Sequence, residues 1–371
     1  MPPNLTVLSR IDPSSHEVDS VSEEDIRKDD MDDFNHPRQR RALILQALRG
    51  RTGVSMEGVG PADSLNVYEK VVSPGLLEFL ETAWSRWEGM GEGGRDALGS
   101  MATAMSNGVP PLIPGNIPLP RDQIQRPSKH VIGQMGYYCT DTCTPIFADL
   151  HHEMLCDAAL MERARRNTDD DSTLFLLTHH PGHHAAYDSF GGYCYVNHVA
   201  ALAVGRRTAI LDVDYHAGNG TASVFYNDPN VLVVSLHCDP DFDYPFHSGF
   251  ADEIGSGDGI GTTLHLPMPP GTKWDTYRVS LEIALTKIVD FAPEQLVISL
   301  GLDTHEGDPC AIRRAGFLLE GDDYRDMGQM LAQQGPKVPT VFVQEGGYRM
   351  DVIGPAAATV VYSFAEARGE M

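Results

Sequence analysis

The sequence predicts an α/β fold built around a central, mostly parallel sheet. The first observation is a series of near-continuous apolar runs of strand length, which are typical of strands buried on both faces of a parallel sheet. The second is the helical spacing of apolar residues between these runs, for example in residues 277–291. In such folds, ligands bind at the carboxyl ends of the strands. The runs are residues 174–178, 209–213, 231–236, 296–300 and 338–343.

The first third of the chain adds further elements. Residues 5–9 are expected to form a strand, and residues 37–49 a helix with apolar side chains at helical spacing. A clearer helix begins after Ser73, a good N-cap, and it has Pro74 at its first position. Residues 88–120 are rich in Gly, Met, Pro and Ser and lack periodicity, which indicates a functional loop or an interface element.

Length and charge restrict the class of protein. With 371 residues and no internal repeat or clear linker, a single domain over residues 1–371 is expected. The formal net charge of −24 argues against a nucleic-acid partner, whereas a cationic partner would be attracted. No apolar run is long enough to cross a membrane, and residues 1–34 lack the apolar region of a signal peptide. Six cysteines in a chain of this length indicate reduced thiols, and hence a cytoplasmic protein.

Polar residues follow several of the predicted strands and suggest a metal site. Asp214 and His216 come after residues 209–213, and we expect them to lie on one face at a strand end. Asp303 can arrive from another strand end and complete three protein ligands, which is the number a catalytic zinc site uses. Such an ion polarises a carbonyl group and activates water. The alternative for Asp214 and His216 alone is a buried, hydrogen-bonded pair.

Imidazole and phenol groups stand beside these predicted ligands. His183 and His184 could share the work of a general base and a general acid, although adjacent histidines also occur in ordinary loops. Asp212 and Asn219 could hold the Nδ1 atoms of the two rings, so the two imidazoles should differ in pKa. Tyr348 follows two glycines and could donate a hydrogen bond to a developing oxyanion; a tyrosine packed in a tight turn is an equal alternative.

Seven segments together resemble the zinc-dependent histone deacetylase superfamily, and most closely its acetylpolyamine amidohydrolase branch. The resemblance covers about four fifths of the chain, from Ser64 to Gly354. The segments are Phe79-Leu80-Glu81-Thr82-Ala83-Trp84, Gly133-Gln134-Met135-Gly136-Tyr137-Tyr138-Cys139, Pro181-Gly182-His183-His184-Ala185, Gly192-Tyr193-Cys194-Tyr195-Val196-Asn197, Asp212-Val213-Asp214-Tyr215-His216, Ser299-Leu300-Gly301-Leu302-Asp303-Thr304 and Glu345-Gly346-Gly347-Tyr348.

The resemblance implies a fold, a set of ions and a set of residue roles. The fold would be an arginase- or deacetylase-like three-layer α/β fold, with one Zn²⁺ per chain on Asp214, His216 and Asp303. His183 and His184 would be the base and acid pair, and Tyr348 the oxyanion donor. The Gly192 carbonyl would accept the substrate amide N–H, and Tyr193 and Phe246 would wall a narrow tunnel. A structural K⁺ would use Asp212, Asp214, His216, Ser235 and Leu236, and a weaker monovalent site the backbone near Phe225, Asp228 and Val231.

Departures from the family pattern affect the expected substrate. His179-His180 replaces the usual Arg-Pro, and Ala217 replaces a His, so the inner pocket is expected to change. The approach to Gly133 is basic or apolar, as in Arg126 and Lys129, and Cys143 stands where a Glu is expected. These features favour a small N-acyl amine or a neutral N-alkyl amide as substrate.

The alternatives are an acetylpolyamine deacetylase, a protein acyl-lysine deacetylase, and a ureohydrolase-like or non-catalytic acyl-binding relative. By resemblance, the insertion at about 88–135 would lie near the tunnel entrance or at the interface of a homodimer or higher oligomer. Arg40 or Arg41 is expected to reach the acid-product side of the site.

Overall fold

A single parallel sheet runs through the centre of the molecule. The computed structural model describes residues 5–10, 37–91, 109–114, 126–166, 173–311 and 316–370. Within these residues, eight strands pair in the order β2-β1-β3-β8-β7-β4-β5-β6, and every pairing is parallel, which confirms the predicted α/β fold. The strands are β1 (Leu5–Arg10), β2 (Val54–Val59), β3 (Thr173–Leu176), β4 (Thr208–Asp212), β5 (Val231–Cys238), β6 (Thr263–Met268), β7 (Gln295–Leu300) and β8 (Thr340–Gln344).

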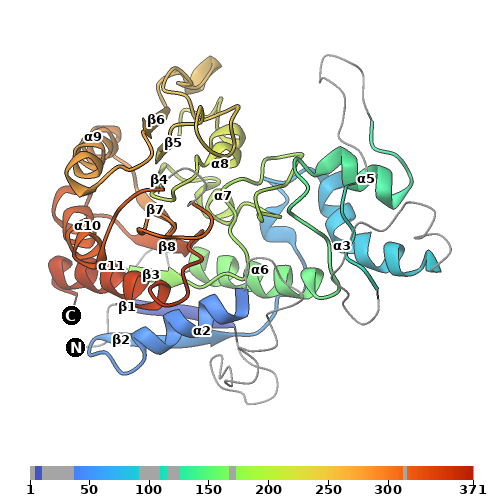
Figure 1. Cartoon of the computed structure of the whole chain (residues 1–371), viewed down its shortest axis with the longest axis horizontal. Helices are drawn as coiled ribbons and strands as arrows, with labels where there is room; N and C mark the ends of the chain where they lie inside the picture. Colours follow the sequence, from blue (N-terminus) through green and yellow to red (C-terminus); the bar gives the residue numbers. More distant parts are fainter. Residues whose placement is uncertain are drawn as a thin grey trace.

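Helices cover both faces of the sheet (Figure 1). Successive residues of β4 show this, because Leu211 belongs to one hydrophobic cluster and Ile210 to the other. The first cluster joins the sheet to α2 (Pro37–Leu48), α9 (Trp274–Phe291), α10 (Gly321–Gln334) and α11 (Ile353–Arg368). The second joins it to α3 (Pro74–Glu88), α5 (Val131–Tyr138), α6 (Leu150–Arg166) and α7 (His198–Ala203). The short elements are α8 (Asn219–Val224), η1 (Asn66–Tyr68) and η2 (Gly257–Gly259).

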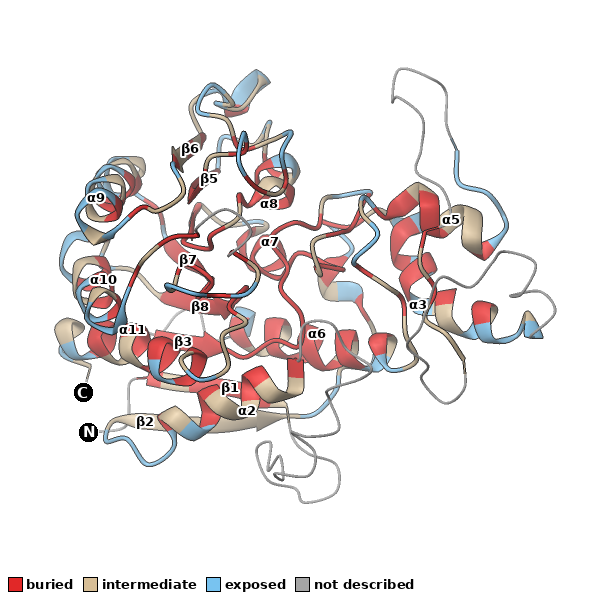
Figure 2. Ribbon diagram, in the orientation of Figure 1, coloured by how far each residue is buried: buried red, intermediate tan, exposed pale blue. Residues whose placement is uncertain are grey.

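Burial follows the position of each strand in the sheet. All residues of β3, β4, β5, β7 and β8 are buried, whereas every residue of the edge strand β2 is only partly buried (Figure 2). Fully buried strands need apolar side chains on both faces, which explains the continuous apolar runs of the sequence.

The elements expected near the N-terminus are present. β1 and α2 match residues 5–9 and 37–49, and α3 begins directly after Ser73, whose side chain accepts a hydrogen bond from the Leu76 N–H at 3.4 Å. The edge strands β2 and β6 and helix α6 were not predicted. α6 is hidden in the sequence because it buries two carboxylates, Glu153 and Asp157, on what would otherwise be an apolar face.

Several expectations concern residues that the structure does not describe. The region 1–34, which was expected to lack the apolar region of a signal peptide, is described only at residues 5–10, and most of the insertion, at 92–108 and 115–125, lies outside the described residues. The described part of the insertion includes residues 109–114, where Leu112 pairs with Ile146 in an isolated bridge. Among the described helices, none has the length and apolar character that crossing a bilayer requires.

Candidate active site

Four neighbouring strands end at one cavity. β3, β8, β7 and β4 are adjacent in the sheet, so the loops that follow them meet at the same edge. These loops carry the predicted site residues His183 and His184, Tyr348, Asp303, and Asp214 with His216. All six line a cavity of about 430 Å³, which is within the size range of small-molecule sites.

Asp214, His216 and Asp303 converge as metal ligands do. His216 Nδ1 lies 3.0 Å from Asp303 Oδ2 and 3.3 Å from Asp214 Oδ1. Ligands held about 2.0–2.1 Å from a tetrahedral zinc ion lie about 3.3 Å from one another, so these atoms fit such an ion. The remaining oxygens are fixed by the backbone, because Asp214 Oδ2 accepts from the Gly346 N–H at 2.8 Å and Asp303 Oδ1 from the Tyr215 N–H at 2.9 Å.

The local geometry of this group differs from the prediction in one respect. β4 ends at Asp212, so Asp214 and His216 are not on one face of a strand. They meet because the chain turns, with the His216 N–H donating to Asp214 Oδ1 at 2.9 Å. The prediction that Asp214 and His216 share one face of a strand is therefore wrong, although the two side chains do meet.

The charges of the three residues also suit a cation. Burial and the nearby Asp214 carboxylate raise the pKa of Asp303 to about 7. Burial alone would raise the pKa of Asp214 as well, but the imidazoles of His183 and His216 outweigh it and hold that pKa below its usual range. A divalent ion between two buried carboxylates would offset their mutual repulsion.

The two adjacent imidazoles have different partners. His183 Nδ1 donates to Asp212 Oδ2 at 2.9 Å, and His184 Nδ1 donates to Asn219 Oδ1 at 2.7 Å. Burial lowers the pKa of His183, but Asp214 and Asp212 outweigh it and raise that pKa to about 10. Burial and the neighbouring His183 and His216 lower the pKa of His184. The opposite directions agree with the difference expected from Asp and Asn as partners.

Tyr348 lies in a loop that is held from a distant helix. Gly346 cannot carry a side chain, because a Cβ would lie 2.5 Å from Asp303 Oδ2, and Gly347 has a φ of 112°. Arg40 of α2 donates to the carbonyl oxygens of Glu345 and Gly347, and its guanidinium lies 4.7 Å from the centre of the Tyr348 ring. Burial raises the pKa of Tyr348, so the phenol keeps its proton at neutral pH.

The wall of the cavity contains both predicted and unpredicted residues. Gly192, Tyr193 and Phe246 line it as expected, and the Tyr193 ring centre lies 5.8 Å from that of Tyr348. The residues that the sequence interpretation did not identify lie on irregular loops, where no periodic pattern marks them: Asp141, Phe242, Asp243, Tyr244, Pro309 and Cys310. The repeated aromatic residues in residues 242–246 were the one available signal.

His179 and His180 do not line the cavity. Their side chains are buried and pair with carboxylates of α6, His179 Nδ1 with Asp157 Oδ1 at 2.8 Å and His180 Nε2 with Glu153 Oε2 at 2.8 Å. Among the described residues that line the cavity, neither histidine is present, nor is Ala217. The two histidines therefore join the loop after β3 to helix α6.

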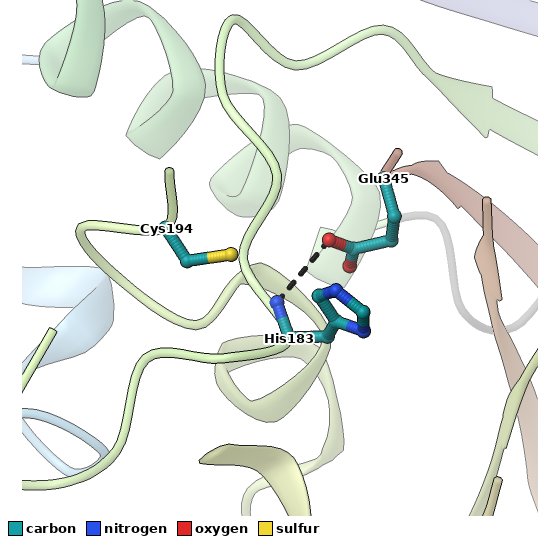
Figure 3. A group of neighbouring side chains, drawn as sticks. All are labelled: His183, Cys194 and Glu345. Atoms are coloured by element: carbon teal, nitrogen blue, oxygen red, sulfur yellow. Dashed lines mark hydrogen bonds between the residues drawn. The ribbon is translucent and has the colours of Figure 1, made fainter. Parts of the chain in front are cut away.

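A second group of potential ligands is His183, Cys194 and Glu345 (Figure 3). Glu345 and Cys194 approach the His183 segment from opposite sides. Glu345 Oε2 accepts from the backbone N–H groups of Gly182 and His183 at 2.6 and 3.2 Å. Burial raises the pKa of the Cys194 thiol, whereas a metal needs the thiolate. These contacts fix the imidazole-bearing loop and do not favour a second ion.

The residues predicted for potassium lie at the end of β4, in the segment that follows it, and within the adjacent strand β5. Asp212 and Ser235 are register partners in the pairing of β4 with β5, and Leu236 follows Ser235. Ser235 Oγ accepts from the Gly218 N–H at 3.3 Å and lies 2.7 Å from His237 Nδ1. For the weaker site, Phe225 and Asp228 form a turn before β5, with the Asp228 N–H donating to the Phe225 carbonyl at 2.9 Å.

Comparisons with known proteins show which family the chain resembles. The histone deacetylase domain family matches residues 115–364. Acetylpolyamine amidohydrolase 1 of Pseudomonas aeruginosa is 37% identical over 296 residues, which cover 78% of this chain and 79% of that protein. The acetylpolyamine amidohydrolase of Mycoplana ramosa is 37% identical over 311 residues, covering 82% and 84%. The crystal structure of acetylpolyamine aminohydrolase from Burkholderia pseudomallei is similar with a TM-score of 0.75 at 28% identity, covering 89% of this chain and 91% of that one.

Proposed function

The chain belongs to the histone deacetylase domain family and is a deacetylase-type amide hydrolase, and we propose that it cleaves small acetylated amines with one zinc ion held by Asp214, His216 and Asp303. The observation that carries this proposal is the convergence of those three ligand atoms beside two imidazoles and a phenol in one cavity. A bound zinc ion would polarise the acetyl carbonyl and lower the pKa of a water molecule.

The residues of the chain divide the remaining chemistry. The pair His183 and His184 accepts a proton from the attacking water and delivers a proton to the leaving amine nitrogen as the C–N bond breaks. Asp212 and Asn219 fix the two rings through their Nδ1 atoms. Tyr348 donates a hydrogen bond to the carbonyl oxygen as negative charge develops there. The products are a carboxylate and an amine.

The charge of the cavity supports a cationic substrate. Four aspartates line it, and no lysine or arginine does so among the described residues. Arg126 and Lys129 argued against a cationic substrate in the sequence, but neither residue lines the cavity. The Pseudomonas and Mycoplana relatives are named for acetylpolyamines. We therefore favour a positively charged acetylated amine over a neutral N-alkyl amide.

Further parts of the proposal rest on the family resemblance. A structural K⁺ would bind at Asp212, Asp214, His216, Ser235 and Leu236, and a weaker one near Phe225. The insertion at about 88–135 would border the tunnel entrance or join two subunits of a homodimer, within one catalytic domain. A cytoplasmic location is supported by the six free cysteines.

A metal and substrate experiment tests the proposal. The purified protein is assayed with an acetylated diamine, a neutral N-alkyl acetamide and an acetyl-lysine peptide, before and after chelation. We expect the highest kcat/KM with the acetylated diamine, a loss of at least about a hundredfold on chelation, and recovery with one zinc ion per chain. Full activity without metal would contradict the mechanism, two manganese ions per chain would favour a ureohydrolase-like enzyme, and preference for the peptide would favour a protein deacetylase.

A further inference from the structure

A strained turn forms part of the cavity wall. Gly191 and Cys194 exchange backbone hydrogen bonds at 3.1 and 2.9 Å, and the two residues between them, Gly192 and Tyr193, have φ values of 58° and 65°. Two consecutive positive φ values define a type I′ turn, which usually takes Gly, Asn or Asp at both central positions. An aromatic residue at such a position is unusual and must be stabilised by its surroundings.

We propose that Asp141 and Thr144 are positioning residues that hold this turn in its catalytic shape. The Gly192 N–H donates to Asp141 Oδ2, and the Tyr193 N–H donates to Thr144 Oγ1 at 3.0 Å. Thr144 Oγ1 in turn donates to Asp141 Oδ2 at 3.1 Å, so the two side chains form one connected group. Both central N–H groups of the strained turn are therefore bonded by the same group, which we call the Asp141–Thr144 clamp.

The clamp is itself firmly held. Asp141 Oδ1 accepts from the Cys143 N–H at 2.7 Å, and Thr144 is fully buried. The segment before it pairs with the strand-like residues before the turn, because the Thr140 N–H donates to the Phe190 carbonyl at 2.9 Å. The turn also lacks room to move toward the imidazoles, since a Cβ on Gly192 would lie 2.2 Å from His184 Cδ2.

The clamp has a consequence for the reaction, and this step rests on the proposed function. Gly192 lines the cavity, and its carbonyl would accept the N–H of the substrate amide. The Cys194 thiol donates a weak bond to the same carbonyl at 3.4 Å, which leaves a second lone pair for the substrate. By fixing the orientation of the turn, the clamp would set both this acceptor and the neighbouring ring of Tyr193. The hydrolysis of a substrate without an amide N–H would depend less on the clamp.

The test compares two substitutions and two substrates. Thr144→Val keeps the shape of the side chain but removes the hydroxyl, whereas Thr144→Ser keeps the hydroxyl and serves as the matched control. Each protein is assayed with an acetylated amine and with the corresponding acetate ester, which lacks the N–H. We expect Thr144→Val to lower kcat/KM for the amide by about five- to tenfold and for the ester by less than about twofold, with Thr144→Ser near wild type on both.

Equal losses for amide and ester, or no loss at all, would overturn the role of the clamp. If Thr144→Val does not fold, Asp141→Asn is used in the same comparison, because an amide can accept at only one of the two oxygen positions. A crystal structure of the variant is a measurement that needs no activity. We expect altered φ values at Gly192 and Tyr193, and an unchanged turn would contradict the proposal. A wild-type protein that hydrolyses no amide would instead refute the proposed function.

Discussion

The two imidazoles that line the cavity show how different surroundings can separate the pKa values of two identical side chains. His183 and His184 are adjacent, with ring centres 4.0 Å apart, and both are buried. The carboxylate of Asp212 can stabilise an imidazolium, whereas the amide oxygen of Asn219 only orients its ring. The arrangement favours a charged His183 beside a neutral His184. In such a pair, the charged ring can donate a proton and the neutral ring can accept one.

A buried histidine outside the cavity affects the pH dependence of stability, and His265 allows this effect to be tested. It lies in β6, is 1% exposed, and neither ring nitrogen has a hydrogen-bond partner among the described residues. Burial lowers its pKa to about 4, below the value of about 6.5 for an unfolded chain. The unfolded state therefore binds this proton first, and the stability that the neutral ring contributes above pH 6.5 is lost as the pH falls toward 4.

We predict that His265→Phe weakens the acid sensitivity of the fold. Phenylalanine keeps the size of the ring and its edge-on contact with His237, but it does not titrate. The free energy of unfolding of the variant, relative to wild type, should rise by about 1.4 kcal/mol between pH 7.5 and pH 5.5. Urea unfolding of both proteins at the two pH values measures this difference. A difference that does not change with pH would show that the pKa of His265 is the same in the folded and unfolded protein, and would contradict the prediction.

At the scale of elements, the site exists because four strands end side by side. The apolar runs predicted β3, β4, β7 and β8, and the polar residues after them indicated a shared site. The sequence could not predict that β8 lies between β3 and β7, because strand order depends on how the crossover helices pack. The convergence of Asp214, His216 and Asp303 was nevertheless predictable, because these polar groups follow strands whose carboxyl ends share one edge of the sheet.

The loops that complete the cavity were harder to predict. Asp141 and Thr144 lie about 50 positions before the turn that they hold, and no spacing in the sequence links the two segments. The same is true of Arg40, which was expected near the site but not as a contact of the loop that carries Tyr348. Such long-range contacts between irregular segments have no periodic signal, so they become visible only in three dimensions.

Helix α2 acts on the site through Arg40, and this contact makes a prediction. Lysine cannot reproduce two parallel bonds to the Glu345 and Gly347 carbonyls or the stacking on Tyr348, so Arg40→Lys should lower kcat about tenfold with little change in KM. Tyr348→Phe alone should lower kcat by about 10²–10³. If Arg40 acts by positioning Tyr348, the kcat of the double variant, Arg40→Lys with Tyr348→Phe, should lie within about twofold of the kcat of Tyr348→Phe alone.

The control for this comparison of single and double variants is a second arginine on the same helix. Arg38 is 40% exposed and pairs with Asp149 at 3.3 Å, so Arg38→Lys should leave kcat unchanged. Steady-state kinetics of the single and double variants supply all the values. Losses that multiply in the double variant would mean that Arg40 serves the reaction in some other way, for example on the side where the acid product leaves.

At the scale of the whole molecule, charge and fold act together. The chain carries a formal net charge of −24, and four aspartates line the cavity that the strand ends form. A bound divalent ion would neutralise two of these four charges, which leaves Asp141 and Asp243 at the wall. Both make hydrogen bonds to neighbouring groups, so they are fixed where they stand. The resulting field would attract a cation along the whole approach to the site.

This field predicts a salt dependence that separates charged from neutral substrates. Raising potassium chloride from 20 to 300 mM shortens the screening length from about 20 Å to about 6 Å, so steering of a cation should weaken. We expect kcat/KM for an acetylated diamine to fall by about three- to tenfold, and kcat/KM for a neutral N-alkyl acetamide to change by less than about twofold. The neutral substrate reports any direct effect of the salt on the enzyme, including an effect of potassium on a structural site. Equal responses of the two substrates would show that the negative charge of the molecule does not select its substrate, and selection would then depend on contacts at the cavity wall.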